Sequence, residues 1–280
     1  MSTQPIPTHP STSGQLANLV IIGAMKCGTS SLHRYLNLHP EIQMSKSKEL
    51  DFFIKEKNWQ RGLDWYQSHF TESAKVRGEA SPNYTKHSIF RGVPERMHQI
   101  IPEAKLIYLV RDPIQRIVSH YLHNFIDRHE LRSLPDALQN LESNHYLHCS
   151  LYYQQLQQFL TYYSPEQILV VSLETLAYDR LKTLRKIFQF LEVDSEFQHP
   201  DFFQIFHQSN QKKRLTHWGV RVVQLPSGGR LRKILPGLLE ESIATPIVSE
   251  DLRQSLVQML SNDIEQLKAF TQLPFAEWSV

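Results

Sequence analysis

The sequence predicts a single α/β domain in which a central parallel β-sheet is flanked by helices. Three apolar, β-branched runs have the character of buried strands, and they lie at residues 19–22, 106–110 and 168–173. Each run is followed by a segment in which apolar residues recur at helical spacing. Because strands that alternate with helices pair in parallel, we expect the three strands to share one sheet with helices on both faces.

The first strand is predicted from Leu19 to Ile22 and is bounded by Gly23. A loop follows, and the apolar residues of segment 31–36 then repeat at the spacing of one helical face. We expect this helix to end near His39-Pro40, because the residue before a proline disfavours helical dihedral angles.

The second strand is predicted at Leu106–Val110, and a helix follows it to about Phe125. Asp112 is suited to cap this helix, and Pro113 is suited to its first position. These two residues therefore set the expected start of the helix.

The third strand is predicted at Ile168–Leu173, followed by a helix near Leu181–Leu191. Apolar residues also form a helical stripe in the C-terminal segment 249–270, which predicts a helix that packs against the core. The segment Lys212–Gly237 is rich in Lys, Arg and Gly and predicts a long loop.

Composition excludes several classes of protein. Lys and Arg number 30 against 28 Asp and Glu, a balance that argues against a protein whose main partner is a nucleic acid. Two cysteines, Cys27 and Cys149, cannot build a disulfide framework, and no apolar stretch is long enough to span a membrane. We expect a disordered tail at residues 1–17, one domain at 18–280 and a cytoplasmic location, because the N-terminus lacks the basic and apolar regions of a signal peptide.

The loop from Gly23 to Ser30 has the composition of a phosphate-binding turn between a strand and a helix. Such a loop points backbone N–H groups at an anion, and the helix dipole adds to the attraction. Gly23 and Gly28 have the spacing of a Walker A motif, but Thr29 stands where that motif has its lysine, and Lys26 is the loop's lysine. An ordinary strand-to-helix turn is the alternative. The combination of lysine, glycines and hydroxyl residues favours a site for one phosphate and the group next to it.

The run from Lys26 to Leu32 resembles the 5′-phosphosulfate loop of sulfotransferases, and it is most similar to their heparan-sulfate-type and bacterial branch. These enzymes use 3′-phosphoadenosine 5′-phosphosulfate (PAPS) and release 3′,5′-ADP. The resemblance extends from about residue 18 to about residue 278. It implies a P-loop-like sulfotransferase fold and sulfuryl transfer to a hydroxyl or amine, with no metal required. It also implies a catalytic role for Lys26, and donor binding by Lys26, Cys27, Gly28, Thr29, Ser30 and Ser31.

A second motif, Leu109-Val110-Arg111-Asp112-Pro113, looks like the family's 3′-phosphate motif. This implies that Arg111 and Ser119 bind the 3′-phosphate. The residues agree with that role, because Arg111 at a strand end would offer a planar charged fork, and Ser119 would add a hydroxyl from the next helix. The alternative is that Arg111 pairs with a nearby carboxylate and that Ser119 is a surface residue.

A third match begins at Lys48 and ends at Phe53, where relatives carry a glutamate before a Phe-Phe pair. The resemblance implies that Glu49 is the catalytic base that takes the acceptor's proton. The alternative is a solvated run of charges around Glu49. The segment from Gly78 resembles another family segment, but Ala80 replaces the lysine of many relatives, and Lys48 is a candidate to supply that charge.

Other roles implied by the resemblance concern the acceptor and the nucleotide. We expect the acceptor to contact Lys48, Phe53, Tyr84, His120 and Tyr152. A basic segment over the nucleotide is expected at Lys212, Lys213 and Arg214, with the region of Arg230 as the competing candidate.

Further predictions concern the ligands that the chain would use. No histidine spacing or carboxylate cluster predicts a metal site. Cys27 lies at a predicted helix N-terminus, where the pKa of a thiol tends to fall. We expect a small-molecule acceptor rather than a polysaccharide. Two other functions stay open: a P-loop nucleotide kinase or NTPase, which the absent Gly-Lys-Ser/Thr step argues against, and a non-catalytic relative that holds a nucleotide or polyanion.

Overall fold

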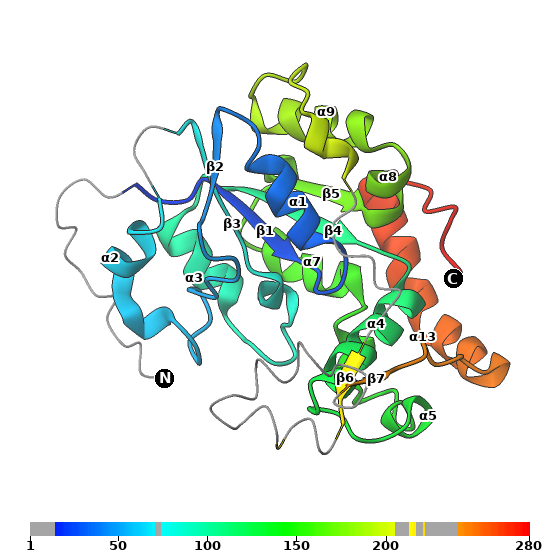
Figure 1. The fold of residues 1–280 in the computed structure, drawn as a ribbon. Coiled ribbons are helices and arrows are strands. Elements are labelled where there is room, and N and C mark those ends of the chain that lie inside the picture. The colour runs from blue at the N-terminus through cyan, green and yellow to red at the C-terminus, as the bar shows by residue number, and fades with distance from the viewer. Residues whose placement is uncertain (1–14, 71–73, 205–212, 217–220, 222–239) are drawn as a thin grey trace.

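The computed structural model describes residues 15–70, 74–204, 213–216, 221 and 240–280. Five parallel strands form one sheet, with the spatial order β2-β3-β1-β4-β5 (Figure 1). The bounds of the strands are β1 Leu19–Gly23, β2 Ile42–Met44, β3 Val76–Ala80, β4 Lys105–Val110 and β5 Ile168–Ser172. The sheet is the predicted α/β core, and the strands predicted at 19–22, 106–110 and 168–173 are its β1, β4 and β5.

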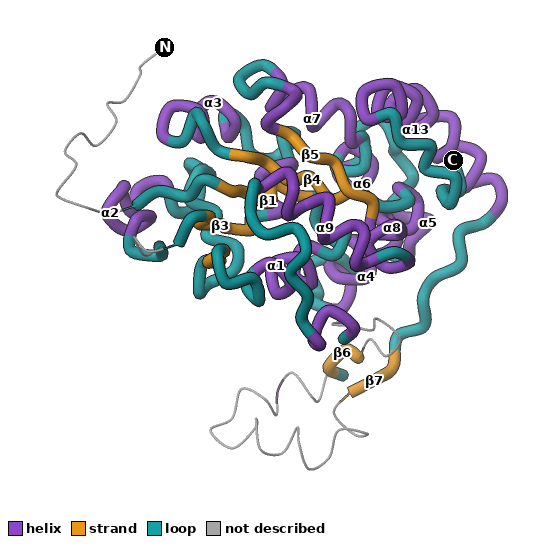
Figure 2. Tube along the Cα trace, turned by 90° about the horizontal axis from the view of Figure 1, so that it is seen from above, coloured by secondary structure: helices purple, strands orange, loops and turns teal. Residues whose placement is uncertain are grey.

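Helices cover both faces of the sheet. Figure 2 shows α1 and α9 on one face, and α3, α7 and α13 on the other. The bounds of the helices are α1 Thr29–Leu36, α2 Gly62–Gln67, α3 Val93–Ile100, α4 Pro113–Ile126, α5 Leu134–Ala137, α6 His145–His148, α7 Tyr152–Leu160, α8 Leu173–Tyr178, α9 Arg180–Leu191 and α13 Glu250–Thr271. Short 3-10 helices lie at η1 Trp59–Arg61, η2 Pro82–Thr85, η3 Pro165–Gln167 and η4 Pro200–Phe203.

The central strand β1 explains where a ligand can bind. Leu19, Val20 and Ile21 of β1 are fully buried, and β1 lies between β3 and β4. After β1 the chain runs to β2 and β3 on one side of β1, and it then crosses to β4 on the other side. In an open parallel sheet, such a reversal of strand order leaves a crevice at the carboxyl ends of the strands. The loop after β1 and the loop after β4 both begin at this edge.

Capping residues begin the helices where the sequence predicts. The Asp112 carboxylate accepts a hydrogen bond from the Gln115 amide at 2.9 Å, and Pro113 is the first residue of α4. Ser249 caps α13 by accepting from the Leu252 amide. The cap at Asp112 confirms the predicted start of α4, and α13 lies in the segment where a C-terminal helix is predicted.

Several elements differ from the sequence prediction. Strands β2 and β3 and helix α8 were not predicted, and residues 213–215, expected to lie in a loop, form β6, which pairs antiparallel with β7 (Glu240–Ser242). The end of the expected disordered tail is folded, because Ala17 is buried and the Leu16 carbonyl accepts from Arg77 Nε at 2.9 Å. Residues 1–14 and the rest of segment 212–237, apart from 213–216 and 221, lie outside the described residues.

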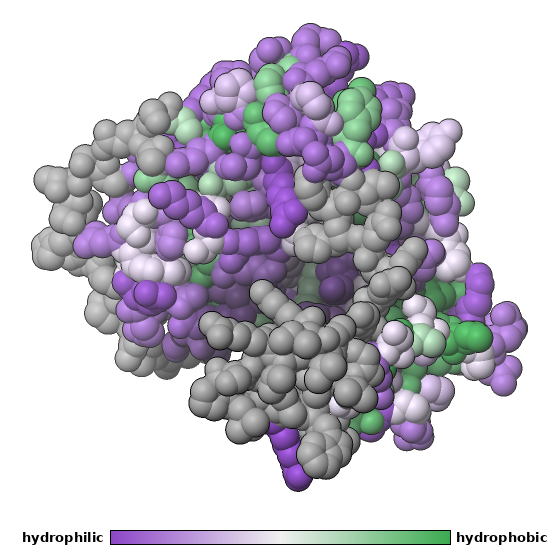
Figure 3. All heavy atoms as spheres, in the orientation of Figure 1, coloured by the Kyte–Doolittle hydropathy of each residue, from purple (hydrophilic) through white to green (hydrophobic). Residues whose placement is uncertain are grey.

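The face seen in Figure 1 is predominantly hydrophilic and is hollowed near its middle, as the space-filling view shows (Figure 3).

Among the described residues, no helix combines the length and the apolar character needed to cross a bilayer.

Candidate active site

The loop between β1 and α1 forms a cradle with free backbone donors. It is tied to the sheet because the Ala24 amide donates to the Leu109 carbonyl at 2.6 Å. Gly28 occupies the N-cap of α1 with a φ of 89°, and it brings no side chain to cap the helix. Within the described part of the chain, the amides of Lys26, Thr29 and Ser30 donate no hydrogen bond. Uncapped N–H groups at a helix N-terminus form a site for an anion.

Two glycines are required by the packing of this cradle. A Cβ on Gly28 would lie 2.6 Å from the Leu173 side chain, and its positive φ is itself unfavourable for any other residue. A Cβ on Gly23 would collide with the Thr85 hydroxyl. The two glycines of the predicted motif therefore allow close packing of the loop against β5–α8 and η2.

Lys26 is a half-buried cation in this loop. None of the hydrogen bonds or ion pairs between described residues involves its ammonium group. Burial lowers the pKa of Lys26. The Asp127 carboxylate acts against this shift, the Arg111 guanidinium adds to it, and the Glu49 carboxylate acts against it. A partly desolvated cation without a partner gains more from a neighbouring anion than one in water. The fold therefore brings Lys26, Arg111 and Glu49 to one site.

Arg111 follows β4 at the same edge of the sheet. Its Nη2 donates to Gln115 Oε1 at 2.9 Å, in the first turn of α4. Gln115 and Ser119 are four residues apart and so lie on one face of that helix. The alternative that Arg111 pairs with a carboxylate finds no support among the described residues, where no ion pair involves it.

Arg116 joins the cradle to the helices beyond it. It is 1% exposed, its Nε donates to the Met25 carbonyl at 3.2 Å, and its Nη1 donates to the Tyr146 carbonyl and the Ser150 hydroxyl at 3.1 and 3.2 Å. All of these acceptors are neutral. The guanidinium therefore acts as a brace, a role that the sequence motif did not reveal.

Glu49 lies in a segment beside the cradle. Its amide donates to the Ala80 carbonyl at 2.9 Å, its φ is 63°, and its Oε1 accepts from Lys48 Nζ at 2.6 Å. Its side chain is 49% exposed, so the carboxylate is open to an incoming group. Solvent exposure and the pair with Lys48 also fit the alternative of a surface charge run, but the proximity of Lys26 does not follow from that alternative.

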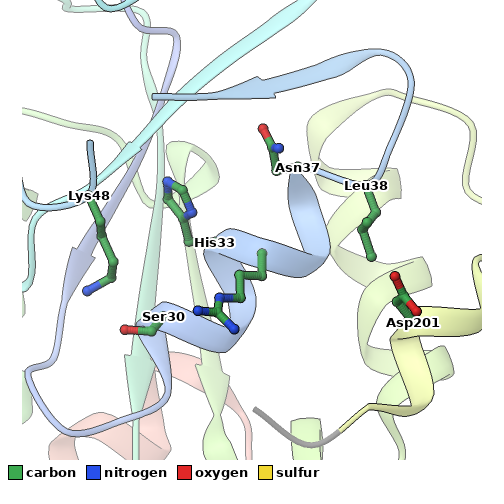
Figure 4. Close-up of a pocket in the computed structure, with 7 residues that line it drawn as sticks. Ser30, His33, Asn37, Leu38, Lys48 and Asp201 are labelled. Atoms are coloured by element: carbon green, nitrogen blue, oxygen red, sulfur yellow. The ribbon is translucent and has the colours of Figure 1, made fainter. Parts of the chain in front are cut away.

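A pocket of about 480 Å³ lies along the outer face of α1 (Figure 4). Ser30 lies at its inner end, and the Lys48 side chain points into it from the segment after β2. The residues that line it are Ser30, His33, Arg34, Asn37, Leu38, Lys48 and Asp201. The pocket therefore connects the start of α1 to the residue next to Glu49.

Two of the predicted acceptor contacts lie in the aromatic core. Phe53 is 0% exposed and Tyr84 is 1% exposed. Their rings meet edge to face at 5.7 Å, and the Phe53 ring also contacts Phe52 at 5.1 Å. The structure leaves neither ring a surface for contact with an acceptor, because the short aromatic run packs inward.

Tyr152 and His120 are also buried. The Tyr152 hydroxyl donates to the Arg111 carbonyl at 2.8 Å and lies 3.6 Å from Cys27 Sγ, so it connects the loop after β4 to the loop after β1. His120 is 3% exposed, and burial together with Arg116 strongly lowers its pKa, which keeps the ring neutral. Neither side chain offers the exposed surface that the predicted acceptor contact needs.

Cys27 differs from the expectation for a thiol at a helix N-terminus. Burial raises its pKa to about 11, despite the nearby guanidinium of Arg116. Its amide donates to the Ala24 carbonyl at 3.1 Å. Desolvation therefore outweighs the lowering effect of the nearby guanidinium, and the buried thiol packs beneath the cradle.

The predicted basic segment is described only in part. Lys212 and Arg230 lie outside the described residues, and the side chain of Lys213 is not described. Arg214 stacks over the Phe125 ring with 4.4 Å to its centroid, near the C-terminal end of α4. This places Arg214 at the opposite end of α4 from Arg111.

His123 and Asp127 are site residues that the sequence did not predict. His123 Nδ1 lies 3.3 Å from Asp127 Oδ2 near the end of α4. The Asp127 carboxylate acts to raise the pKa of Lys26, while burial and the charge of Lys26 lower the pKa of His123. The i,i+4 spacing of a histidine and a carboxylate on one helix is a signal that could have paired them. Their approach to Lys26 depends on the tertiary fold. Within the described chain, no group of three or more His, Cys, Asp or Glu residues is arranged to hold a metal ion.

Comparison with known proteins adds independent findings. Residues 16–220 match the family model of the sulfotransferase domain. The crystal structure of a sulfotransferase from Alicyclobacillus acidocaldarius has a TM-score of 0.70 and 25% sequence identity, and the similarity covers 95% of this chain and 100% of that one.

Curated relatives are similar over shorter stretches. Heparan sulfate glucosamine 3-O-sulfotransferase 5 from Homo sapiens is 29% identical over 191 residues, which is 64% of this chain and 54% of the relative. The membrane-associated sulfotransferase kil1 from Dictyostelium discoideum is 37% identical over 111 residues, or 38% and 22% of the two chains. The chain thus spans about half the length, or less, of these curated relatives.

Proposed function

We propose that this chain, which belongs to the sulfotransferase domain family, transfers a sulfuryl group from PAPS to an acceptor hydroxyl or amine. The observation that carries the proposal is the uncapped N-terminus of α1, with Lys26 beside it and Arg111 and Glu49 nearby. The Lys26 ammonium has no hydrogen-bond or ion-pair partner among the described residues. A site of this kind holds an anion on one side and a proton acceptor on the other.

Donor binding is assigned to the cradle and to the start of α4. The free amides and hydroxyls of Thr29 and Ser30 would hold the 5′-phosphate, and Arg111 with Ser119 would hold the 3′-phosphate. These groups fit the donor because a helix N-terminus and an arginine fork both favour phosphate oxygens. PAPS supplies an activated sulfuryl group and, as 3′,5′-ADP, a stable leaving group.

The transfer step is an in-line displacement at sulfur. Glu49 takes the proton of the acceptor as the new bond from the acceptor to sulfur forms. The bond between sulfur and the bridging phosphate oxygen breaks, and its electron pair leaves with 3′,5′-ADP. Lys26 stabilises the negative charge that grows on that oxygen. Positioning and fixed charge would supply most of the rate increase, as they do in phosphoryl transfer.

The acceptor is proposed to enter through the pocket along α1. Lys48, His33 and Asn37 give this pocket polar walls, which suit an acceptor with several hydrogen-bonding groups. The names of relatives such as heparan sulfate glucosamine 3-O-sulfotransferase 5 do not support the expected preference for a small molecule over a polysaccharide. We therefore propose a polar acceptor without restricting its size, and a cytoplasmic location stays a prediction.

The direct test is transfer of labelled sulfate from PAPS by the purified protein to a panel of acceptors, from phenols and amines to amino sugars and heparan-type oligosaccharides. We expect labelled product and an equal amount of 3′,5′-ADP. Hydrolysis of ATP that depends on Mg²⁺ would instead favour the kinase or NTPase alternative. Binding of 3′,5′-ADP without transfer to any acceptor would favour the non-catalytic alternative.

A further inference from the structure

A buried carboxylate lies behind the segment that carries Glu49. Glu79 is 0% exposed near the end of β3, where it pairs in register with Val20 of β1. Three hydroxyl groups donate to it: Tyr66 at 2.8 Å, Ser81 at 2.7 Å and Tyr84 at 3.1 Å. No ion pair between described residues involves Glu79. A buried carboxylate without a cation needs such donors to remain in the fold.

Two of the three hydroxyl groups also accept hydrogen bonds from the backbone of segment 49–53. The Asp51 amide donates to the Ser81 hydroxyl at 3.0 Å, and the Phe53 amide donates to the Tyr84 hydroxyl at 3.4 Å. Each hydroxyl thus accepts from the segment and donates to Glu79. The Tyr66 hydroxyl has no such link, although its ring stacks on Phe52.

The segment has a backbone that needs this support. Glu49 has a φ of 63° and Asp51 a φ of 47°, both in the left-handed region that residues other than glycine seldom adopt. Such conformations persist only where surrounding structure holds them, and they gather at functional sites. The Glu49 amide is itself bound to the Ala80 carbonyl, next to Glu79 in sequence.

We propose that Glu79 is a positioning residue that holds segment 49–53, through Ser81 and Tyr84, in the conformation that presents Glu49 to the acceptor. The proposal rests on the role of Glu49 in the proposed function. Because the ionised carboxylate accepts at both oxygens, it can keep both hydrogen-bond relays at once, from the Asp51 amide through Ser81 and from the Phe53 amide through Tyr84. An amide in its place has one donating end, so at least one of the three hydroxyls loses its acceptor there, and the loss weakens a relay when that hydroxyl belongs to Ser81 or Tyr84.

The first test measures the relays without any assay of activity. Hydrogen exchange is followed in peptides that contain residues 49–53 and in peptides of the cradle, for the wild type, Glu79→Gln and Tyr84→Phe. We expect exchange in segment 49–53 to be faster by about tenfold in both variants, with the cradle unchanged. Tyr66→Phe is the matched control, because it removes a hydroxyl from the same carboxylate without a link to the segment. Unchanged exchange in Glu79→Gln and Tyr84→Phe overturns the proposal, as does an equal increase in Tyr66→Phe.

The second test links the relays to Glu49. We expect Glu79→Gln to lower kcat by about tenfold to a hundredfold with the affinity for 3′,5′-ADP unchanged, since small displacements of a catalytic group have effects of this size. In a Glu49→Gln background the same change should have no further effect on kcat. An equal loss in both backgrounds shows that Glu79 does not act through Glu49 and overturns the proposal.

Failure of the proposed function gives a different pattern. If the wild type transfers no sulfate, or if Glu49→Gln keeps full kcat, the assignment of the reaction or its base is wrong. Faster exchange in segment 49–53 would still support the relays in that case. Unchanged exchange in a protein that does transfer sulfate overturns the relays alone.

Discussion

The Arg116 guanidinium donates from Nε to the Met25 carbonyl at 3.2 Å, and so connects the loop after β1 to helix α4, which lie far apart in the sequence. Met25 immediately precedes Lys26 in the cradle, and Arg116 lies in the helix that begins after Arg111. The same guanidinium binds the carbonyl of Tyr146. Arg116 of α4 therefore holds the loop residue that precedes Lys26.

This relationship predicts the behaviour of Arg116→Lys. A lysine keeps the charge but cannot reach all the acceptors of the planar fork, so buried carbonyls lose their donor. We expect a loss of about 2–4 kcal/mol in the free energy of unfolding, typical of a broken buried network, and weaker binding of 3′,5′-ADP. Urea unfolding and calorimetric titration measure both. Arg91→Lys, at an exposed position, is the control and should change stability by less than about 0.5 kcal/mol. Equal effects of the two changes would contradict the bracing role.

Gly28→Ala is expected to distort the cradle for two separable reasons. The alanine must adopt a positive φ, at a cost of about 1–2 kcal/mol, and its Cβ must displace Leu173. Gly92→Ala is the matched control, because Gly92 also caps a helix with a left-handed φ, of 70°, and a Cβ there would meet the flexible end of the Arg96 side chain. We expect Gly28→Ala to lower the thermal midpoint more than Gly92→Ala does, and Leu173→Ala to remove the excess. Equal shifts in the two glycine variants would show that close packing at Gly28 is unimportant.

Lys26→Met tests the charge at the centre of the site. Methionine keeps most of the side-chain volume and removes the ammonium group. We expect kcat for sulfate transfer to fall by about 10²–10³-fold, as is usual when one donor to a developing anion is lost. Lys46→Met changes an exposed lysine in the segment before Glu49 and should leave kcat unchanged. A similar kcat for both variants and the wild type would remove Lys26 from the mechanism.

The burial of Glu79 predicts how the stability of the protein depends on pH. Burial raises the pKa of this carboxyl from 4.5 to about 7, against the lowering effect of its Ser81, Tyr66 and Tyr84 hydrogen bonds. The folded state therefore favours the protonated form, and this contribution to stability is present at low pH and is lost as the pH rises toward about 7.

Glu79→Gln is neutral at every pH and lacks this loss. As the pH rises from about 4.5 to about 7, the free energy of unfolding of the variant should increase relative to that of the wild type by on the order of 3 kcal/mol. Above this window the difference should level off. Urea unfolding of both proteins across the window gives the measurement. A difference that does not depend on pH would show that Glu79 titrates at its ordinary value.

The strands that could be predicted are those with continuous apolar runs. β1, β4 and β5 are buried on both faces, so their sequences contain little else than apolar residues. β2 is three residues long, and β3 includes Arg77 and Glu79, so neither carries that signal. α8 follows β5 without a break, and the apolar run of β5 continues into Leu173, the first residue of α8, so the predicted strand extends one residue too far.

The candidate site could be predicted to the extent that it follows from local spacing. Lys26, Gly28 and Arg111 belong to loops at strand ends, where the chain itself directs them to one edge of the sheet. The inward packing of Phe53 and Tyr152 could not be predicted, because an aromatic residue beside a motif can line a pocket or fill the core. Contacts between distant segments, such as that of Arg116 with Met25, carry no local signal at all.

The central claim is that the cradle and the start of α4 together bind an adenosine with phosphates at both the 3′ and 5′ positions. Calorimetric titration of the wild type and Arg111→Ala with 3′,5′-ADP and 5′-AMP tests it most directly. We expect the wild type to prefer 3′,5′-ADP by about tenfold to a hundredfold, the worth of charged hydrogen bonds to one phosphate, and Arg111→Ala to lose this preference. Equal affinity of the wild type for the two nucleotides, or an unchanged preference in Arg111→Ala, would contradict the account.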